Sequence, residues 1–319
     1  MVRSFYNLSK HKVQYSTLLV LVTIWIIFLI GSPRTFLSFP IYSSFMSTIP
    51  ASAIMALALT FVIITSEIDL SFPSIMGFSG WVFIAVYINS GNIYLALLVC
   101  LVTGIIAGFL NGIIVTKLRI PSLVATIGTM FFWRGLTMIC AAGKGESITI
   151  SKNTLLHSIM VGRIGGYIPA QVVWAIFIAG ILGIVLNRHK LGAHVFYSGD
   201  NINSAKMMGV NINKTKIFVF SMLGFFAAFA AVVACLEITY FYPSLGEGYL
   251  LKTIAAVFLG GTSAFGGVGT IFGTFIGALI IGCIEAGIVA IGISGFWTQL
   301  IYGLIIIISI TITSKIKKK

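Results

Sequence analysis

Charged residues are scarce in this chain of 319 residues: they make up only 8% of it, whereas hydrophobic residues make up 58%. A soluble globular domain carries about a quarter charged residues, so this composition does not suit a water-facing surface. Uncharged runs long enough to span a bilayer recur from one end of the sequence to the other. The sequence therefore predicts a polytopic integral membrane protein.

The sequence also lacks the motifs of common catalytic sites. The nearest fragment to a G-x-x-x-x-G-K-[ST] phosphate loop is Gly143-Lys144, which has neither the upstream glycine nor the following hydroxyl residue. The four histidines fall in tails or loops without H-E-x-x-H spacing, and no G-x-S-x-G elbow occurs. We expect no catalytic residues, metal site or cofactor, and we expect ATP hydrolysis to need a separate subunit.

The uncharged stretches predict an all-α bundle of about ten membrane segments within one domain, residues 1–319. The expected segments are Thr17–Gly31, Phe45–Ser66, Phe72–Ser90, Ile93–Thr116, Pro121–Ala142, Tyr167–Asn187, Ile217–Leu236, Thr253–Phe265, Ile271–Ala290 and Trp297–Thr313. The eighth is short and runs into four glycines with a structural role, Gly260, Gly261, Gly266 and Gly267. We expect it to be a broken or re-entrant helix, which a membrane protein tolerates where protein or a wet cavity surrounds it.

Basic residues orient these segments. With a cytoplasmic N-terminus and ten alternating crossings, 14 of the 20 Lys and Arg residues fall inside: Arg3, Lys10, Lys12, Lys117, Arg119, Arg188, Lys190, Lys206, Lys214, Lys216, Lys315, Lys317, Lys318 and Lys319. This asymmetry follows the positive-inside rule, so both termini are expected in the cytoplasm. The net charge of +13 then reflects topology, and we expect no nucleic-acid partner.

A long inside connection, residues 188–216, contains a second expected element. Asp200 is predicted to cap a short helix over Asn201–Met208, and Gly209 suits the left-handed residue that ends one. Ile202 and Ala205, with Met207 or Met208 one turn on, are expected to give this helix an apolar face. Two interpretations stay open: an amphipathic segment on the membrane surface, or a protruding helix that docks into a cytoplasmic partner.

Glycines repeat at four-residue spacing in two of the expected segments, at Gly104, Gly108 and Gly112 and again from Gly269 to Gly277. Such stripes let neighbouring helices pack backbone to backbone, and we interpret them as structural.

A few charges fall at membrane depth, where ionisable groups are costly and usually functional. They are Glu67, Asp69, Arg134 and Glu285. A proton relay would use such residues. Structural pairing, with one another or with exposed helix ends, is the interpretation we favour.

Four segments, in order, resemble the ribose-type permeases of bacterial ATP-binding cassette importers. They are Ile68-Asp69-Leu70-Ser71 with Ser74; Asn111-Gly112, Lys117–Pro121, Ala125–Met130 and Arg134-Gly135-Leu136; Gly199-Asp200-Asn201 through Ala205 with Gly209-Val210-Asn211; and Leu259–Thr270. The chain departs from the family pattern at Ser66-Glu67, where a glycine is usual, at Phe72-Pro73, where Val-Gly is common, and at Asn203-Ser204-Ala205, where Glu-Ala-Ala is frequent.

The resemblance implies a permease subunit in the bacterial cytoplasmic (inner) membrane. Its implied partners are membrane lipid, a second permease (an identical chain or a close homologue), a cytoplasmic ATPase and an extracytoplasmic substrate-binding protein. The resemblance also implies that the 188–216 loop couples the permease to the ATPase, through Asp200, Asn201, Ala205 and Gly209.

The expected function is import of a monosaccharide or related small polar solute by alternating access. Polar and aromatic candidates for the translocation pathway are Asp69, Trp133 and Glu285. Two alternatives stay open: the same type of permease for branched-chain amino acids or nucleosides, and an ion-coupled secondary transporter. A secondary transporter would be expected to show repeated halves with paired broken helices.

Overall fold

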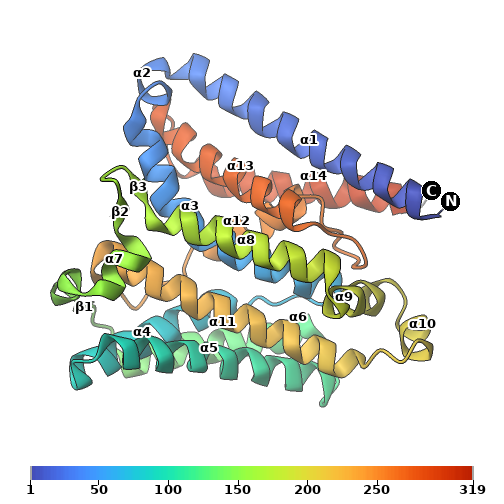
Figure 1. The fold of residues 1–319 in the computed structure, drawn as a ribbon, viewed down its shortest axis with the longest axis horizontal. Coiled ribbons are helices and arrows are strands. Elements are labelled where there is room, and N and C mark those ends of the chain that lie inside the picture. The colour runs from blue at the N-terminus through green and yellow to red at the C-terminus, as the bar shows by residue number, and fades with distance from the viewer. Residues whose placement is uncertain (1, 318–319) are drawn as a thin grey trace.

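In a computed structural model the chain is described from residue 2 to residue 317, with side chains described from residue 15 to residue 311. The long helices run side by side (Figure 1). The helices are α1 (Val2–Gly31), α2 (Pro33–Phe36), α3 (Phe39–Ile64), α4 (Phe72–Ser90), α5 (Ile93–Thr116), α6 (Ser122–Cys140), η1 (Thr149–Asn153), α7 (Leu155–Val161), α8 (Ala170–Arg188), α9 (Lys190–Asp200), α10 (Ile202–Met207), α11 (Ile212–Ile238), α12 (Tyr249–Leu259), α13 (Ile271–Ala290) and α14 (Trp297–Lys317).

Sheet structure in the described chain is limited to two short antiparallel ribbons. The strands β1 (Glu146–Ser147) and β4 (Tyr240–Phe241) pair with each other, and so do β2 (Arg163–Ile164) and β3 (Ile168–Pro169). The predicted polytopic helical bundle is therefore confirmed.

Seven of the described helices are long and apolar enough to cross a membrane: α3, α4, α5, α6, α8, α11 and α13. Shorter apolar helical stretches cover Tyr15–Gly31, Tyr249–Leu259 and Trp297–Thr311. The seven long helices and the three shorter stretches correspond one to one to the ten expected segments. The number of membrane crossings therefore depends on how the three shorter stretches lie in the membrane.

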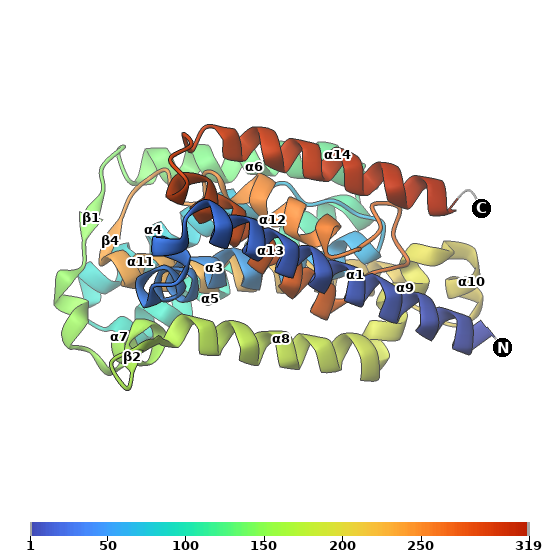
Figure 2. The same cartoon turned by 90° about the horizontal axis from the view of Figure 1, so that it is seen from above.

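The two ends of the bundle differ in content. The start of α1, the end of α14 and the helices α9 and α10 lie at one end, while α7 and the short ribbons lie at the other (Figures 1 and 2). We call the first the inner end, because the basic residues of the 188–216 loop lie there, and the second the outer end.

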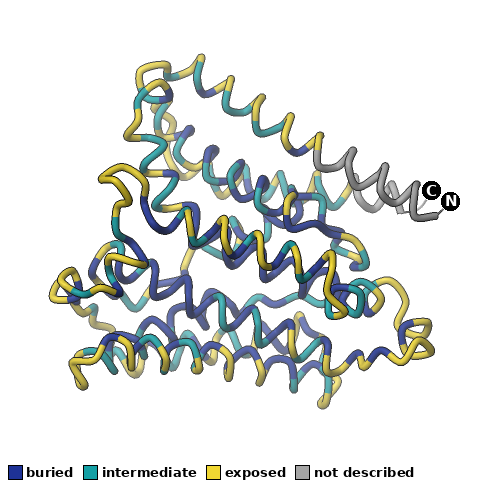
Figure 3. The backbone as a smooth tube through the Cα atoms, in the orientation of Figure 1, coloured by how far each residue is buried: buried dark blue, intermediate teal, exposed yellow. Residues whose placement is uncertain are grey.

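The helix α3 forms the centre of the bundle. In its most apolar window 89% of the residues are buried, compared with 22% in α6 and 33% in α5. Exposed apolar side chains such as Leu98, Ile106 and Phe131 lie on α5 and α6 at the periphery of the bundle, as expected where lipid is the solvent. Figure 3 shows the same contrast between a buried interior and exposed helix faces and loops.

The first glycine stripe joins α5 to α11. A Cβ on Gly104 would overlap the Gly224 carbonyl oxygen, and one on Gly108 would overlap the Phe220 carbonyl oxygen. A Cβ on Gly112 would lie 2.7 Å from Ile217 Cα. The two backbones are thus in direct contact, which confirms the structural interpretation of this stripe.

The expected broken segment is a short helix with non-helical chain at both ends. The helix α12 has 11 residues, about 17 Å at 1.5 Å per residue, which is roughly half of a 30 Å bilayer core. Gly261, Gly266 and Gly267 in the turn after it have positive φ angles of 83°, 77° and 74°. Gly260 packs on the backbone of Gly273, where a Cβ would lie 2.5 Å from the carbonyl carbon.

The non-helical chain before α12 is held by Arg134 of α6. The Arg134 guanidinium donates hydrogen bonds to the carbonyl oxygens of Pro243 (2.8 Å) and Leu245 (3.2 Å). Residues outside a helix lose their internal hydrogen-bond partners, and such groups need others at membrane depth. Arg134 provides them here: the sequence predicted structural pairing for this residue, and its partners are non-helical carbonyls rather than a helix end.

Candidate translocation cavity and coupling loop

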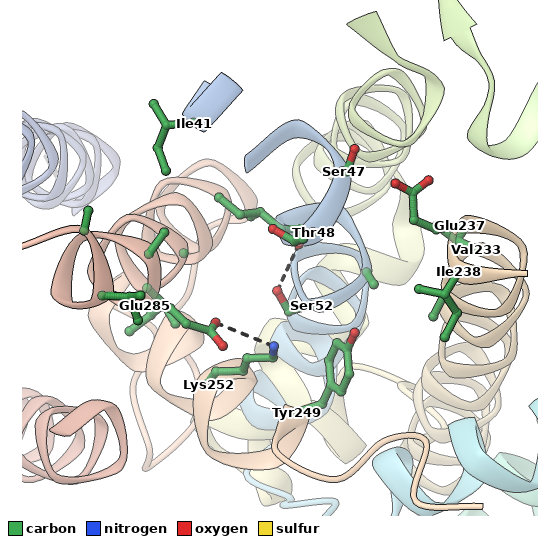
Figure 4. A pocket seen from close by; sticks show the side chains of 18 of the residues that line it. Ile41, Ser47, Thr48, Ser52, Val233, Glu237, Ile238, Tyr249, Lys252 and Glu285 are labelled. Atoms are coloured by element: carbon green, nitrogen blue, oxygen red, sulfur yellow. Dashed lines mark hydrogen bonds and ion pairs between the residues drawn. The ribbon is translucent and has the colours of Figure 1, made fainter. Parts of the chain in front are cut away.

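A cavity of about 640 Å³ opens between α3, α11, α12 and α13 (Figure 4). Polar side chains from all four helices line it, together with Thr35 and Tyr242 from outside them: Ser47, Thr48, Ser52, Glu237, Tyr249, Lys252 and Glu285. Ser52 stands 13 residues after Phe39 in a helix of 26 residues, so the cavity reaches the middle of α3. Beyond it, the apolar residues from Ala53 to Ile64 are at most 2% exposed, and they close the inner half of α3.

Lys252 and Glu285 form the charged centre of the cavity. The Lys252 Nζ lies 3.7 Å from Glu285 Oε2, and the side chains are 17% and 50% exposed. The same Nζ lies 4.1 Å from the centre of the Tyr249 ring, where the aromatic face attracts a cation. An unpaired ammonium within the bundle would be costly, and Glu285 and Tyr249 are the partners of Lys252 here.

A second hollow of about 510 Å³ adjoins the cavity at the outer end. The two share Ser47, Thr48 and Glu237 in their linings, and Arg163 of β2 lines the outer hollow. Arg163 donates a hydrogen bond of 2.7 Å to Ser43 Oγ, and the buried Gln171 donates one to the Glu237 carboxylate. Polar side chains therefore line a continuous path from the outer rim to the middle of α3.

Ser47 adds an available polar group to this path. Its hydroxyl oxygen is buried and has no hydrogen-bond partner within the part of the chain that the structure describes. Ser47 Oγ therefore has unused hydrogen-bonding capacity beside the hollow.

Of the three pathway candidates from the sequence, the structure places Glu285 in the cavity lining. Asp69 is fully buried elsewhere: its Oδ1 accepts hydrogen bonds from the Ser71 amide and hydroxyl, and its Oδ2 accepts one of 3.2 Å from Asn111. Trp133 packs against Phe78 with tilted rings whose centroids are 5.2 Å apart, and it is 7% exposed. The pathway roles of all three residues remain predictions.

Each of the four charged residues noted at depth has a partner. Glu67 pairs with Lys216 at the start of α11, and Glu285 pairs with Lys252. Arg134 also lies 3.9 Å from Glu247, in addition to its backbone contacts. This pattern agrees with structural pairing as the main use of these charges. Lys252 was missed as a cavity residue, although a lysine at the edge of an apolar segment was a signal for it.

The 188–216 loop contains two helices where the sequence predicted one. Asp200 ends α9, and Asn201 caps α10 by accepting a hydrogen bond of 3.0 Å from the Ser204 amide. The cap is therefore Asn201, one residue after the predicted cap Asp200. Gly209 has a φ of 78°, which confirms the left-handed stop after α10.

The apolar residues of α10 point in two directions. Ala205 is 1% exposed and packs in a small cluster with Val210 and Ile212. Met207 and Met208 are 84% and 62% exposed. The end of α10 thus presents two adaptable apolar side chains at the inner end of the molecule.

The model of one protein family matches residues 41–310, and that family is described as the branched-chain amino acid transport system permease component. The chain belongs to this permease family. It is a permease subunit of an ATP-binding cassette importer and a multi-pass protein of the cytoplasmic membrane.

Similar proteins include import permeases from several bacteria. The chain is 34% identical to the ribose import permease protein RbsC of Escherichia coli K12 over 266 residues, which is 83% of this chain and 82% of the relative. It is 33% identical to RbsC of Haemophilus influenzae over 260 residues, 81% and 80% of the two chains. It is 32% identical to the autoinducer 2 import system permease protein LsrC of Yersinia enterocolitica over 278 residues, 86% and 75% of the two chains.

Proposed function

We propose that this permease imports a monosaccharide or a related small polar solute, and that the solute passes through the cavity between α3, α11, α12 and α13. The names of the similar permeases, for ribose and for autoinducer 2, support the solute class. The observation that carries the proposal is the Lys252–Glu285 pair, which lines the cavity together with hydroxyl groups such as that of Ser52. Charged and hydroxyl groups can hydrogen-bond a polyhydroxylated solute as it sheds water.

Transport through this cavity requires a change at the inner end. The polar path runs from the outer rim to the middle of α3, and the inner half of α3 is closed by packed apolar residues. The proposed cycle therefore alternates between this arrangement and one in which the inner end of α3 and the glycine-rich turn move together and open the inner half of the path. Weak contacts along the path suit a solute that must leave as easily as it enters.

We assign residues 188–216 as the cytoplasmic coupling loop within a single permease domain. Its proposed partner is an ATPase subunit that binds the exposed Met207 and Met208, with Asp200, Asn201, Ala205 and Gly209 shaping α10. A substrate-binding protein would deliver solute at the outer hollow, and a second permease chain, identical or homologous, would complete the complex within the lipid.

A second candidate solute class is a branched-chain amino acid, as in the description of the matched family. The cavity offers one specific observation in its favour: an ammonium and a carboxylate 3.7 Å apart could pair with the opposite charges of a zwitterion.

The test is solute uptake by proteoliposomes that contain the permease with its co-purified ATPase, binding protein and any second permease. We expect uptake of a labelled monosaccharide that unlabelled monosaccharides block and leucine does not. Glu285→Gln should lower that uptake at least about fivefold, the effect of weakening one charge-assisted interaction. The matched control is Glu146→Gln at an exposed outer position. Leucine uptake in place of sugar uptake would favour the second candidate, and equal uptake by both variants would reject the cavity as the path.

A further inference from the structure

Three segments far apart in the sequence meet at the inner end: the end of α3, the end of α9 and the glycine-rich turn between α12 and α13. The Gly267 amide donates a hydrogen bond of 2.9 Å to the Ile64 carbonyl oxygen. A Cβ on Gly199 would overlap that same oxygen and would lie 2.8 Å from the Gly267 nitrogen. The backbones of all three segments are therefore in contact, with no side chain between them.

Ser66 joins these segments through one side-chain atom. Its Oγ lies 2.9 Å from the Gly199 carbonyl oxygen and 3.1 Å from the Phe265 carbonyl oxygen, so its single proton is shared between the two acceptors. Ser66 has a φ of 62°, a left-handed conformation that is unfavourable for a residue with a side chain. This conformation places the hydroxyl between α9 and the glycine-rich turn.

Each of the three segments adjoins a different functional part of the molecule, so the contact between them links these parts. Gly199 is followed by Asp200 and by Asn201, the cap of α10, so a displacement of α10 acts on Gly199 over two residues. Ser66 follows the closed inner half of α3 after one residue, Thr65. The glycine-rich turn joins α12 to α13, the helices that carry Lys252 and Glu285. Closely packed backbones transmit displacements because they cannot absorb them by side-chain rearrangement.

We propose that Ser66 is a positioning residue for energy coupling, which ties the α10 end of the coupling loop to the inner ends of α3 and α12–α13. When the ATPase moves α10, the Ser66 hydroxyl makes the end of α3 and the glycine-rich turn move with Gly199. The inference rests on the proposed docking of the ATPase at α10.

The test is Ser66→Gly in the reconstituted transport complex. Glycine accepts the left-handed conformation, so the substitution removes the hydroxyl and leaves the backbone unstrained. The measured quantity is the number of solute molecules imported per ATP hydrolysed, which does not depend on how much complex is present. We expect roughly a fivefold lower ratio, as the loss of about one hydrogen bond predicts, with the ATPase still bound.

The matched control is Ser90→Gly. The Ser90 hydroxyl also donates to a backbone carbonyl, that of Val86, but it lies at the outer end of α4. This control should keep the parent ratio. The proposal would be overturned if Ser66→Gly imported as many solute molecules per ATP as the unchanged permease. Loss of ATPase binding by Ser66→Gly would also overturn it, because the hydroxyl would then serve docking or folding.

A docking variant separates this inference from the proposed function on which it rests. Met207→Glu places a charge on the exposed end of α10 and should prevent co-purification of the ATPase. If Met207→Glu retains the ATPase, α10 is not the docking site and the proposed coupling loop fails. If Met207→Glu loses the ATPase while Ser66→Gly keeps a parent ratio, only the role of Ser66 fails.

Discussion

Lys252 and Glu285 face each other from neighbouring helices, with Nζ and Oε2 3.7 Å apart, and both line the cavity that reaches the middle of the bundle (Figure 4). One residue belongs to the short helix α12 and the other to α13, on the two sides of the glycine-rich turn. The backbones of α12 and α13 are in direct contact at Ala256 and Gly277, which holds the two charges next to each other.

The role of the Lys252–Glu285 pair in transport can be tested by exchanging the two charges. Lys252→Glu alone would set two carboxylates against each other, and Glu285→Lys alone would do the same with two ammonium groups. Each should lower uptake by about tenfold or more, because a like pair in a partly buried site costs at least 1.4 kcal/mol. The double variant Lys252→Glu with Glu285→Lys restores an opposite pair and should recover part of the uptake. A double variant as inactive as the two single variants would mean that the residues act separately.

The α5–α11 contact predicts a stability effect. Gly108→Ala would force a methyl group into the Phe220 carbonyl, so the helices would have to move apart. We expect about 1–3 kcal/mol of destabilisation, measured as a lower thermal midpoint of the permease in detergent. Gly128→Ala is the matched control, because nothing lies within 4 Å of a Cβ at that helical position. Similar midpoints for the two variants would show that this contact does not hold the bundle together.

The unwound chain before α12 predicts a role for Arg134. Arg134→Met keeps the apolar length of the side chain but leaves the Pro243 and Leu245 carbonyls without this donor. We expect the segment before α12 to lose about 3–6 kcal/mol of local stability, since each of the two bonds to the charged donor contributes roughly 1.5–3 kcal/mol. Faster proteolysis or labelling of cysteines introduced at 242–248 would measure it. Arg34→Met, at an exposed outer position, should leave both rates unchanged. Equal rates in the two variants would contradict a structural role for Arg134.

The exposed end of α10 predicts where the ATPase binds. Met207→Glu should lower ATPase recovery at least about tenfold, because charge is depleted at the cores of protein interfaces. Leu155→Glu makes a comparable change at an exposed apolar position of α7, at the outer end, and should leave recovery unchanged. Full recovery with Met207→Glu would place the docking surface elsewhere.

The ten apolar segments could be predicted from the sequence because the thickness of a bilayer sets the length of each run. The helix ends could not be predicted as closely: α3 begins at Phe39 instead of Phe45, and α1 extends back to Val2. Polar residues continue a helix past the apolar run, and hydrophobicity does not record where that extension ends. The helix α9 was missed because Lys190–Asp200 mixes charged, apolar and glycine residues without a clear stop.

The candidate site depended on tertiary contacts that a single sequence does not contain. The sequence indicated that Arg134 and Glu285 needed partners, but the carbonyls of Pro243 and Leu245 lie more than 100 residues away from Arg134. Asp69 attracted attention as an acid at depth, and its partners, Ser71 and Asn111, explain how it is accommodated. A charge in an apolar segment therefore signals a pairing more reliably than it signals a pathway.

The measurement that tests the central claim most directly is the energy dependence of solute uptake in proteoliposomes that contain the permease, its ATPase and its binding protein. We predict that uptake requires ATP and the ATPase subunit and continues in the presence of an uncoupler. Uptake by the permease alone, without ATP and abolished by the uncoupler, would contradict this and would identify an ion-coupled secondary transporter.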